Sequence, residues 1–156
     1  MNINKKLTYA FLVIFFFIVG NSIFGNIKNE KDKILETVNK FLKVLETGDT
    51  GLAKEILVIE GSNFSIREEG GSYKIKHTNY NELIASLPEM KGRYKEIITD
   101  PEILVHKNIA VLWAKYKFFI DGKFSHCGVD SFSLIKIEDK WKIASIIYTV
   151  EKKGCK

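Results

Sequence analysis

Asp130 is the residue of this sequence whose type and surroundings best fit chemistry. It interrupts the apolar face of a predicted strand, between Gly128 and Phe132. Burial disfavours the charged form of a carboxyl group, so Asp130 is expected to have a raised pKa and to be able to act as a general acid or base. The alternative is structural: the Trp113 indole and the Thr149 hydroxyl would hold Asp130 as a buried hydrogen-bonding group.

His126 is the second candidate catalytic residue, because it precedes Asp130 by four positions on the same strand face. At about 3.3 Å per residue, the two side chains are roughly 13 Å apart, which is too far for a direct hydrogen bond. A bulge at Gly128 or a bound ligand would be needed to join them. The alternative is an ordinary histidine at a strand end beside Lys117, near the mouth of a pocket.

The two cysteines, Cys127 and Cys155, are expected to form a disulfide in an oxidising compartment. The predicted strand register places position 152 beside Cys127, so the C-terminal tail must curl to bring Cys155 there. A buried Cys127 with a free thiol at Cys155 is the alternative. Adjacent residues of a strand point to opposite faces, so His126 and Cys127 cannot share a metal ion or act as a Cys–His pair. No metal and no cofactor are predicted.

The first 25 residues have the pattern of a signal peptide. Lys5 and Lys6 precede an uncharged apolar run over residues 7–20, and the small residues Gly20, Ser22 and Gly25 follow it. A run of about 10–14 apolar residues is shorter than the roughly 20 that span a bilayer. We therefore expect an exported protein, periplasmic or secreted, with one domain over residues 26–156. An uncleaved N-terminal anchor is the alternative.

Composition and charge give little support to a nucleic-acid partner. The net charge is 24 − 19 = +5, and removal of residues 1–25 takes away two lysines and leaves +3. The lysines are scattered over the chain, and we find neither a glycine-rich phosphate loop nor a basic arm. We expect no nucleic acid and no membrane contact beyond the signal segment.

Apolar spacing and turn residues predict an α+β domain with its helices on one side of a sheet. Asp121-Gly122 and Asp139-Lys140 are the expected hairpin turns, and Pro101 suggests a bulge. The predicted elements are a helix over 29–47, a short helix ending near Leu57, a hairpin at Gly70-Gly71 within 65–77, a helix over 78–87, and a four-stranded antiparallel meander over 94–105, 109–120, 124–137 and 141–150.

These turns fix which residues face each other across the strands. Counting from them places Trp113 opposite Asp130, and Asp130 opposite Thr149. One face then carries Trp113, Lys117, His126, Asp130, Phe132 and Thr149, and the other carries Leu112, Tyr116, Val129, Ile146 and Tyr148. Both faces are too apolar for water, so we expect the helices to cover one and a second subunit to cover the other, as a homodimer. A slip of one residue would exchange the two lists.

The leading helix that ends in ETGD, and above all the segment WAKYKFFIDGKFSHCGVDSFSLIKIEDKWKIASIIYT with its HCGVDSF and WKI pieces, resemble the nuclear transport factor 2-like (SnoaL-like) superfamily. The segment looks like an exported, largely uncharacterised bacterial branch of it. The resemblance implies a cone-shaped fold, in which N-terminal helices pack on a strongly curved antiparallel sheet around a hydrophobic pocket, usually in a dimer. The superfamily includes polyketide cyclases, a ketosteroid isomerase, dehydratases, an epoxide hydrolase and binding domains without activity. No position here reproduces the isomerase's pattern of one Tyr and two Asp, so the resemblance supplies no activity.

The leading hypothesis is an exported domain that binds a small hydrophobic or aromatic ligand in an apolar pocket lined by Trp113, Tyr116, Phe132 and Thr149. The alternative is an acid/base enzyme of the isomerase, cyclase or dehydratase type that uses Asp130 with His126 or Tyr116. A protein-interaction module that uses the open sheet face is a third reading. A second ionisable group close to Asp130 would favour the enzyme.

Overall fold

The structure is a computed structural model that describes residues 28–155. The predicted signal peptide, residues 1–25, lies outside the described residues. Within 28–155, no helix combines the length and the apolar character needed to cross a membrane.

The three predicted helices are present, and each ends within one residue of the predicted position. The N-terminal helix covers residues 28–47 and stops before Gly48, whose positive φ of 67° suits glycine. Helix α2 (Thr50–Ile56) is capped by Asp49, whose carboxylate accepts a hydrogen bond from the Leu52 amide at 2.9 Å. Helix α3 (Tyr80–Ser86) is capped in the same way by Asn79, and a short 3₁₀ turn, η1 (Leu87–Glu89), follows it.

The sheet has six strands and mixed direction. The predicted four-stranded meander is present as β3 to β6, and the predicted hairpin is present as β1 and β2 with its turn at Gly70-Gly71. The hairpin extends the same sheet, because β1 pairs in parallel with β6, so the expectation of a wholly antiparallel sheet was wrong. The strand order is β2-β1-β6-β5-β4-β3. The strands are β1 (Leu57–Glu69), β2 (Ser72–Asn79), β3 (Tyr94–His106), β4 (Ile109–Ile120), β5 (Lys123–Ile137) and β6 (Lys140–Val150).

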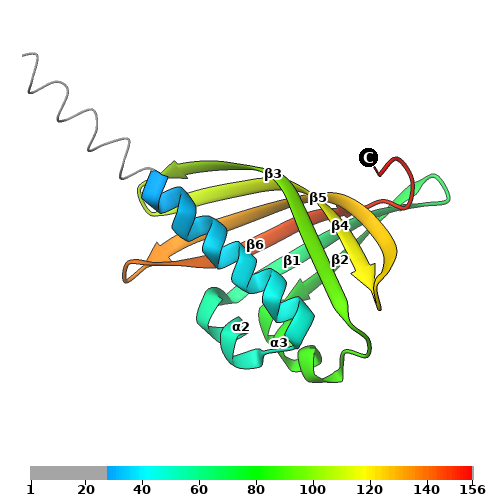
Figure 1. The fold of residues 1–156 in the computed structure, drawn as a ribbon, viewed down its shortest axis with the longest axis horizontal. Coiled ribbons are helices and arrows are strands. Elements are labelled where there is room, and N and C mark those ends of the chain that lie inside the picture. The colour runs from blue at the N-terminus through cyan, green and yellow to red at the C-terminus, as the bar shows by residue number, and fades with distance from the viewer. Residues whose placement is uncertain (1–27, 156) are drawn as a thin grey trace, which may run out of the picture.

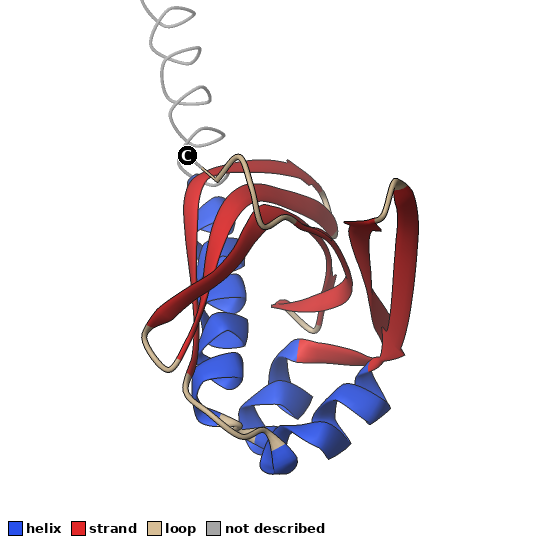
Figure 2. Ribbon diagram, turned by 90° about the vertical axis from the view of Figure 1, so that its right-hand side faces the viewer, coloured by secondary structure: helices blue, strands red, loops and turns tan. Residues whose placement is uncertain are grey.

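The sheet curves strongly, and the helices lie on one side of it. The N-terminal helix runs across the strands (Figure 1), and Figure 2 shows the strands bending around it while α2 and α3 lie together at one end. The predicted irregularity at Pro101 is confirmed, because the pairing of β3 with β4 shifts between Thr99 and Glu102.

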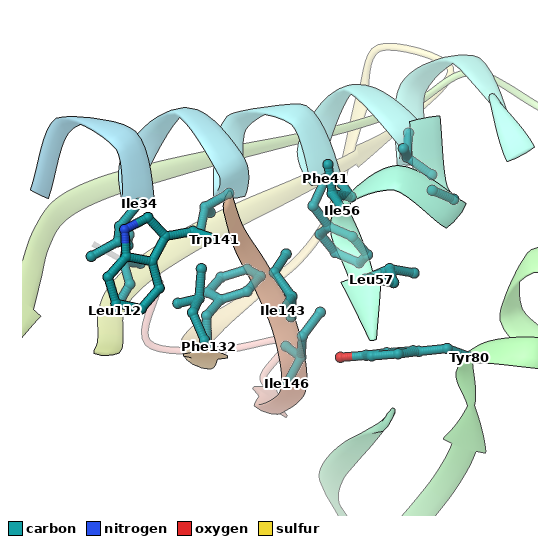
Figure 3. Packing of buried hydrophobic residues seen from close by; sticks show 14 of the residues in the cluster. Ile34, Phe41, Ile56, Leu57, Tyr80, Leu112, Phe132, Trp141, Ile143 and Ile146 are labelled. Atoms are coloured by element: carbon teal, nitrogen blue, oxygen red, sulfur yellow. The ribbon is translucent and has the colours of Figure 1, made fainter. Parts of the chain in front are cut away.

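The core fills the space between the N-terminal helix and the concave face of the sheet (Figure 3). Phe41 of the helix packs edge-on against Phe132 of β5, with ring centroids 5.9 Å apart. Each large apolar side chain buried in this way contributes about 1.5–3 kcal/mol. The helix and the sheet are therefore held rigidly against each other, and this fixes the side chains between them.

The predicted register was wrong in both of the last two hairpins. The first turn is Asp121-Gly122, as predicted, but the pairing then shifts between Phe118 and Phe119, so that Trp113 faces Ser131 and Asp130 faces Ala114. An extra residue on one strand produces such a shift and turns over the side chains beyond it.

The second turn is Glu138-Asp139 rather than Asp139-Lys140; both of its residues have positive φ, as a two-residue type I′ turn requires. This turn and a shift in the pairing between Ser133 and Leu134 together place Asp130 opposite Tyr148 and not Thr149.

As a consequence, each observed face of the sheet combines residues from both of the predicted faces. Leu112, Tyr116 and Ile146, expected between two subunits, are buried within the chain at 0–2% exposure. Trp113, expected beside Asp130, lies on the outer face and is 52% exposed. We call this outer face of β3, β4 and β6 the convex face; its exposed apolar side chains are Ile97, Leu104, Ile109, Val111, Trp113 and Ile147.

Candidate functional site

A cavity of about 180 Å³ lies between the N-terminal helix, α3 and the concave face of the sheet. Its wall is mainly apolar and aromatic, and its polar groups come from five different strands. The apolar lining residues are Phe41, Leu45, Leu83, Phe118, Phe132 and Ile146, and the polar ones are Asn63, Glu96, Tyr116, His126, Asp130 and Tyr148. An apolar cavity of about 150 Å³ accommodates benzene, so this one has room for a molecule of one or two small rings.

Asp130 lines this cavity and is 3% exposed. Its Oδ2 atom is buried without a hydrogen-bond partner among the residues described. Its carboxyl group lies within hydrogen-bonding reach of the carboxyl group of Glu96, which is partly buried on β3. The cavity therefore contains a pair of neighbouring carboxyl groups, which we call the carboxyl pair.

Glu96 was missed by the sequence reasoning. It occupies an inward position of β3, between the partly buried Tyr94 and Ile98, and faces Phe118 across the strands. The alternation of Tyr94, Glu96 and Ile98 with exposed neighbours was the available signal.

Burial raises the pKa of Asp130 to about 7, even though a hydrogen bond from Glu96 lowers it. Burial also raises the pKa of Glu96 well above its usual range, and the nearby charge of Asp130 adds to this effect. Two carboxyl groups this close cannot both ionise readily. Near neutral pH, the carboxyl pair therefore retains a proton.

Two tyrosines flank the carboxyl pair. The Tyr116 hydroxyl donates a hydrogen bond to the Thr149 carbonyl oxygen at 2.6 Å, and its ring packs against Gly128 of β5. A Cβ atom at Gly128 would collide with that ring and with Thr149, so only glycine leaves room for Tyr116 in this position. Burial raises the pKa of both Tyr116 and Tyr148, so both phenols are neutral hydrogen-bonding groups.

His126 lines the same cavity. Its ring stacks on Phe118 with centroids 4.9 Å apart, and its Nδ1 atom is 3.0 Å from the Ser125 hydroxyl. Burial lowers the pKa of His126, and the positive charges of Arg67 and Lys152 lower it further. In residues 28–155 we find no hydrogen bond between His126 and Asp130, so the structure places them in one cavity but not in a dyad.

Of the four predicted pocket residues, Tyr116 and Phe132 line the cavity, and Trp113 and Thr149 do not. Trp113 is on the convex face. The Thr149 hydroxyl accepts a hydrogen bond from the Val129 amide and donates one to Glu151, both at 3.0 Å. The idea that Trp113 and Thr149 hold Asp130 was therefore wrong, because it depended on the incorrect register.

Cys127 and Cys155 form a disulfide, with their Cα atoms 5.8 Å apart. The backbone of Cys127 pairs with Glu151 through hydrogen bonds of 3.0 and 2.8 Å, and not with position 152 as predicted. The remaining tail residues curl back to reach Cys127. In the described part of the chain, no three His, Cys, Asp or Glu residues cluster closely enough to hold a metal ion.

Comparisons with known proteins give one family and a set of similar folds. The model of the family described as "Putative lumazine-binding" matches residues 29–149. No curated protein matches the sequence.

Among solved structures, three show the range of similar proteins. A nuclear transport factor 2-like superfamily protein of Salmonella enterica serovar Typhimurium is 18% identical (TM-score 0.63; 82% of this chain and 95% of that one). A similar protein of unknown function from Silicibacter pomeroyi is 16% identical (TM-score 0.59; 80% and 98%). The beta subunit of a "putative aromatic-ring-hydroxylating dioxygenase" from Novosphingobium aromaticivorans is 12% identical (TM-score 0.67; 81% and 92%).

Proposed function

Because the chain belongs to the family described as "Putative lumazine-binding", we propose that its cavity binds a small, flat, largely apolar ligand. The similar structures establish the nuclear transport factor 2-like fold, which confirms the superfamily and the cone-shaped α+β architecture expected from the sequence. The observation that supports the function is the cavity itself: an aromatic wall with a few converging polar groups.

The aromatic lining of the cavity favours a ligand with a flat ring over a ligand with a flexible aliphatic chain. Phe41, Phe118 and Phe132 present aromatic surface from three different elements. Small-molecule sites typically combine such an apolar wall with few polar groups, which orient the ligand. In this cavity, the carboxyl pair would give the ligand its orientation.

Lumazine is the first probe to test, by isothermal titration calorimetry with the purified chain. We expect saturable binding by the wild type and weaker binding by Phe118→Leu, which removes aromatic surface from the cavity. Phe124→Leu is the matched control, because Phe124 lies in the same hairpin but is 47% exposed. Folded protein that binds neither lumazine nor any other small aromatic probe would overturn the proposal.

Acid/base catalysis is the second candidate function, and the neighbouring Glu96 favours it. A protonated carboxyl group beside an ionised one can donate and accept protons in a single site. We propose Asp130 as the proton-transferring group, with His126 in the lining of the same cavity as a possible second proton carrier. Under this proposal, Asp130→Asn lowers any turnover by roughly a hundredfold or more and leaves the fold intact, whereas unchanged turnover would exclude it.

We also propose that the protein is exported, to the periplasm or the medium. The apolar run over residues 7–20 and the disulfide between Cys127 and Cys155 both support this proposal, since disulfides persist in oxidising compartments. Protein recovered from those compartments should lack residues 1–25, and its mass should be about 2 Da below that of its reduced form. A retained N-terminus with two alkylatable thiols would contradict export.

The proposed partner is a second copy of the chain. The apolar side chains of the convex face support this proposal, because a sheet face of this kind seldom stays in water. The alternative is that a different protein binds the same face, as in an interaction module. The oligomeric state of the purified chain distinguishes the two.

A further inference from the structure

Residues 28–155 contribute no lysine and no arginine to the lining of the cavity, although they contribute two acidic side chains. We infer that the cavity selects a flat ring with a cationic, N–H-donating group, such as an amidinium or a protonated amino-heterocycle, seated against Asp130 and Glu96. This inference rests on the proposed ligand binding in the same cavity and names the chemical class of the ligand.

The first argument is the unpartnered oxygen. Asp130 Oδ2 is buried, and among residues 28–155 the Asp130 carboxyl group has no hydrogen-bonding neighbour other than the carboxyl group of Glu96. A buried acceptor without a donor is unfavourable, so a ligand that supplies an N–H group there gains more than it would at a satisfied site. Because Glu96 lies alongside, two acceptors are available, which suits a planar fork of N–H groups.

The second argument is that the described lining residues provide no positive charge to balance a negative charge on the carboxyl pair. Around the carboxyl pair, β4 contributes Tyr116, β6 contributes Tyr148 and β5 contributes His126; burial raises the pKa of the two phenols and lowers that of the imidazole. The N-terminal helix and α3 contribute apolar lining residues.

The two cations that act on His126 lie outside the lining. Arg67 and Lys152 lower the pKa of His126, but neither has a resolved effect on Asp130 or Glu96. A negative charge on the carboxyl pair therefore has no cationic partner from the described chain in the cavity, and a ligand cation can take that place.

The third argument concerns what the site excludes. A carboxylate or phosphate placed beside the carboxyl pair would be repelled, and this repulsion is strong where water is displaced. The aromatic rings of the wall act in the same direction, because ring faces attract cations and not anions.

Three probes of one shape and different charge test the inference: benzamidine as the cation, benzamide as the neutral isostere and benzoate as the anion. Titration calorimetry at about pH 8 should show benzamidine binding at least about tenfold tighter than benzamide, and no measurable binding of benzoate. Near pH 5, where the carboxyl pair is protonated, the preference for benzamidine should disappear, and benzamide should bind as before.

Two variants assign the effect to the carboxyl pair. Glu96→Gln and Asp130→Asn should each lower the affinity for benzamidine about tenfold or more and leave the affinity for benzamide unchanged. Glu102→Gln is the matched control, because it removes an exposed carboxylate from the same strand as Glu96. Circular dichroism shows whether each variant folds. If one of the two variants fails to fold, the other is sufficient to test the inference.

The possible outcomes separate the inference from the proposed function. Equal affinities for benzamidine and benzamide, or binding of lumazine without any preference for the cation, would overturn the inference and leave the ligand pocket standing. Failure of the folded wild type to bind lumazine and all three benzene derivatives would overturn both. A preference for benzamidine that survives in both variants would also overturn the inference.

Discussion

The carboxyl pair has its unusual chemistry because two acidic residues from different strands meet in an apolar place. Burial alone raises the pKa of each of these two acids, and their proximity adds to the effect on Glu96. Together they titrate as a unit, in which ionisation of one opposes ionisation of the other. The two residues lie on β3 and β5, which are separated in the sheet by β4, so the pairing of three strands is needed to produce this arrangement.

The pH dependence of stability should reveal the pair. A carboxyl group whose pKa is raised on folding is ionised more easily in the unfolded chain, so the free energy of unfolding falls as the pH rises from the ordinary pKa of 3.8 to about 7. Asp130→Asn should flatten this decline, and denaturant titrations at several pH values would measure it. Superimposable curves for the two proteins would mean that Asp130 is solvated.

Tyr80 provides a second prediction at this scale. Its side chain is fully buried, and its hydroxyl has no partner in the described chain. Tyr80→Phe should therefore leave stability unchanged or raise it by about 1 kcal/mol, because a desolvated hydroxyl is removed and no bond is lost. In contrast, Tyr116→Phe removes the bond to Thr149 and should cost about 1 kcal/mol in a thermal melt. A lower melting temperature for Tyr80→Phe would point to a partner for that hydroxyl.

Among the elements, the N-terminal helix is fastened to the sheet through Glu30. Its carboxylate accepts a hydrogen bond from the Trp141 indole at 2.8 Å and pairs with Lys136 at 2.9 Å. The hydrogen bond from Lys136, followed by that from Trp141, lowers the pKa of Glu30 despite its burial. This connection closes the helix over the concave face and so over the cavity.

Glu30→Gln should destabilise the fold by about 1–3 kcal/mol at neutral pH, because it weakens charge-assisted bonds to partly buried partners. The wild-type advantage should fade as acid protonates Glu30, since a lowered pKa contributes stability only while the carboxylate is ionised. The control is Glu36→Gln, whose exposed pair with Lys40 on the same helix should contribute about 0.5 kcal/mol or less. Chemical denaturation would measure the free energy of unfolding of both variants. Equal losses of stability would show that Glu30 does not fasten the helix to the sheet.

The sequence predicts the elements of this fold better than their register. Periodicity and capping residues place every helix and the strands β3 to β6 to within a few residues, because these signals are local. The register shifts beside Phe119 and between Ser133 and Leu134 have no comparable signal, yet each moves side chains from one face to the other. Asp130 was found because it stands among apolar neighbours, whereas Glu96 was missed because its partner is on another strand. The pairing of β1 with β6 is equally non-local.

At the scale of the whole molecule, the convex face should govern assembly. Trp113 is half exposed there, on the same strand as the exposed Val111. Trp113→Glu should convert a dimer into a monomer, because a charge would be buried in an interface that typically covers about 1,600 Å² in total. Tyr73→Glu, at an exposed aromatic residue of the β1–β2 hairpin, is the matched control. Light scattering coupled to gel filtration would measure the masses; a monomeric wild type would contradict the proposed dimer.

The disulfide should stabilise the whole domain without shaping the cavity. It closes a loop with a sequence separation of 28, so Cys155→Ser should lower the free energy of unfolding by about 2–4 kcal/mol. Since neither cysteine lines the cavity, affinity for a small aromatic probe should change little. Calorimetry and thermal melts would measure the two effects, and loss of binding in a folded variant would show that the tail is part of the site.

The parallel pairing of β1 with β6 also sets the order in which the molecule can be assembled. Phe64 must find Ile147, although most of the chain lies between them, and the N-terminal helix must lie on strands made much later. Contacts between such distant segments slow folding. During synthesis, the sheet therefore stays open between β1 and β5 until the last strand has left the ribosome. A chain that ends just before β6 has two separate sheet fragments, β2-β1 and β5-β4-β3, and the sheet closes only after β6 has been made.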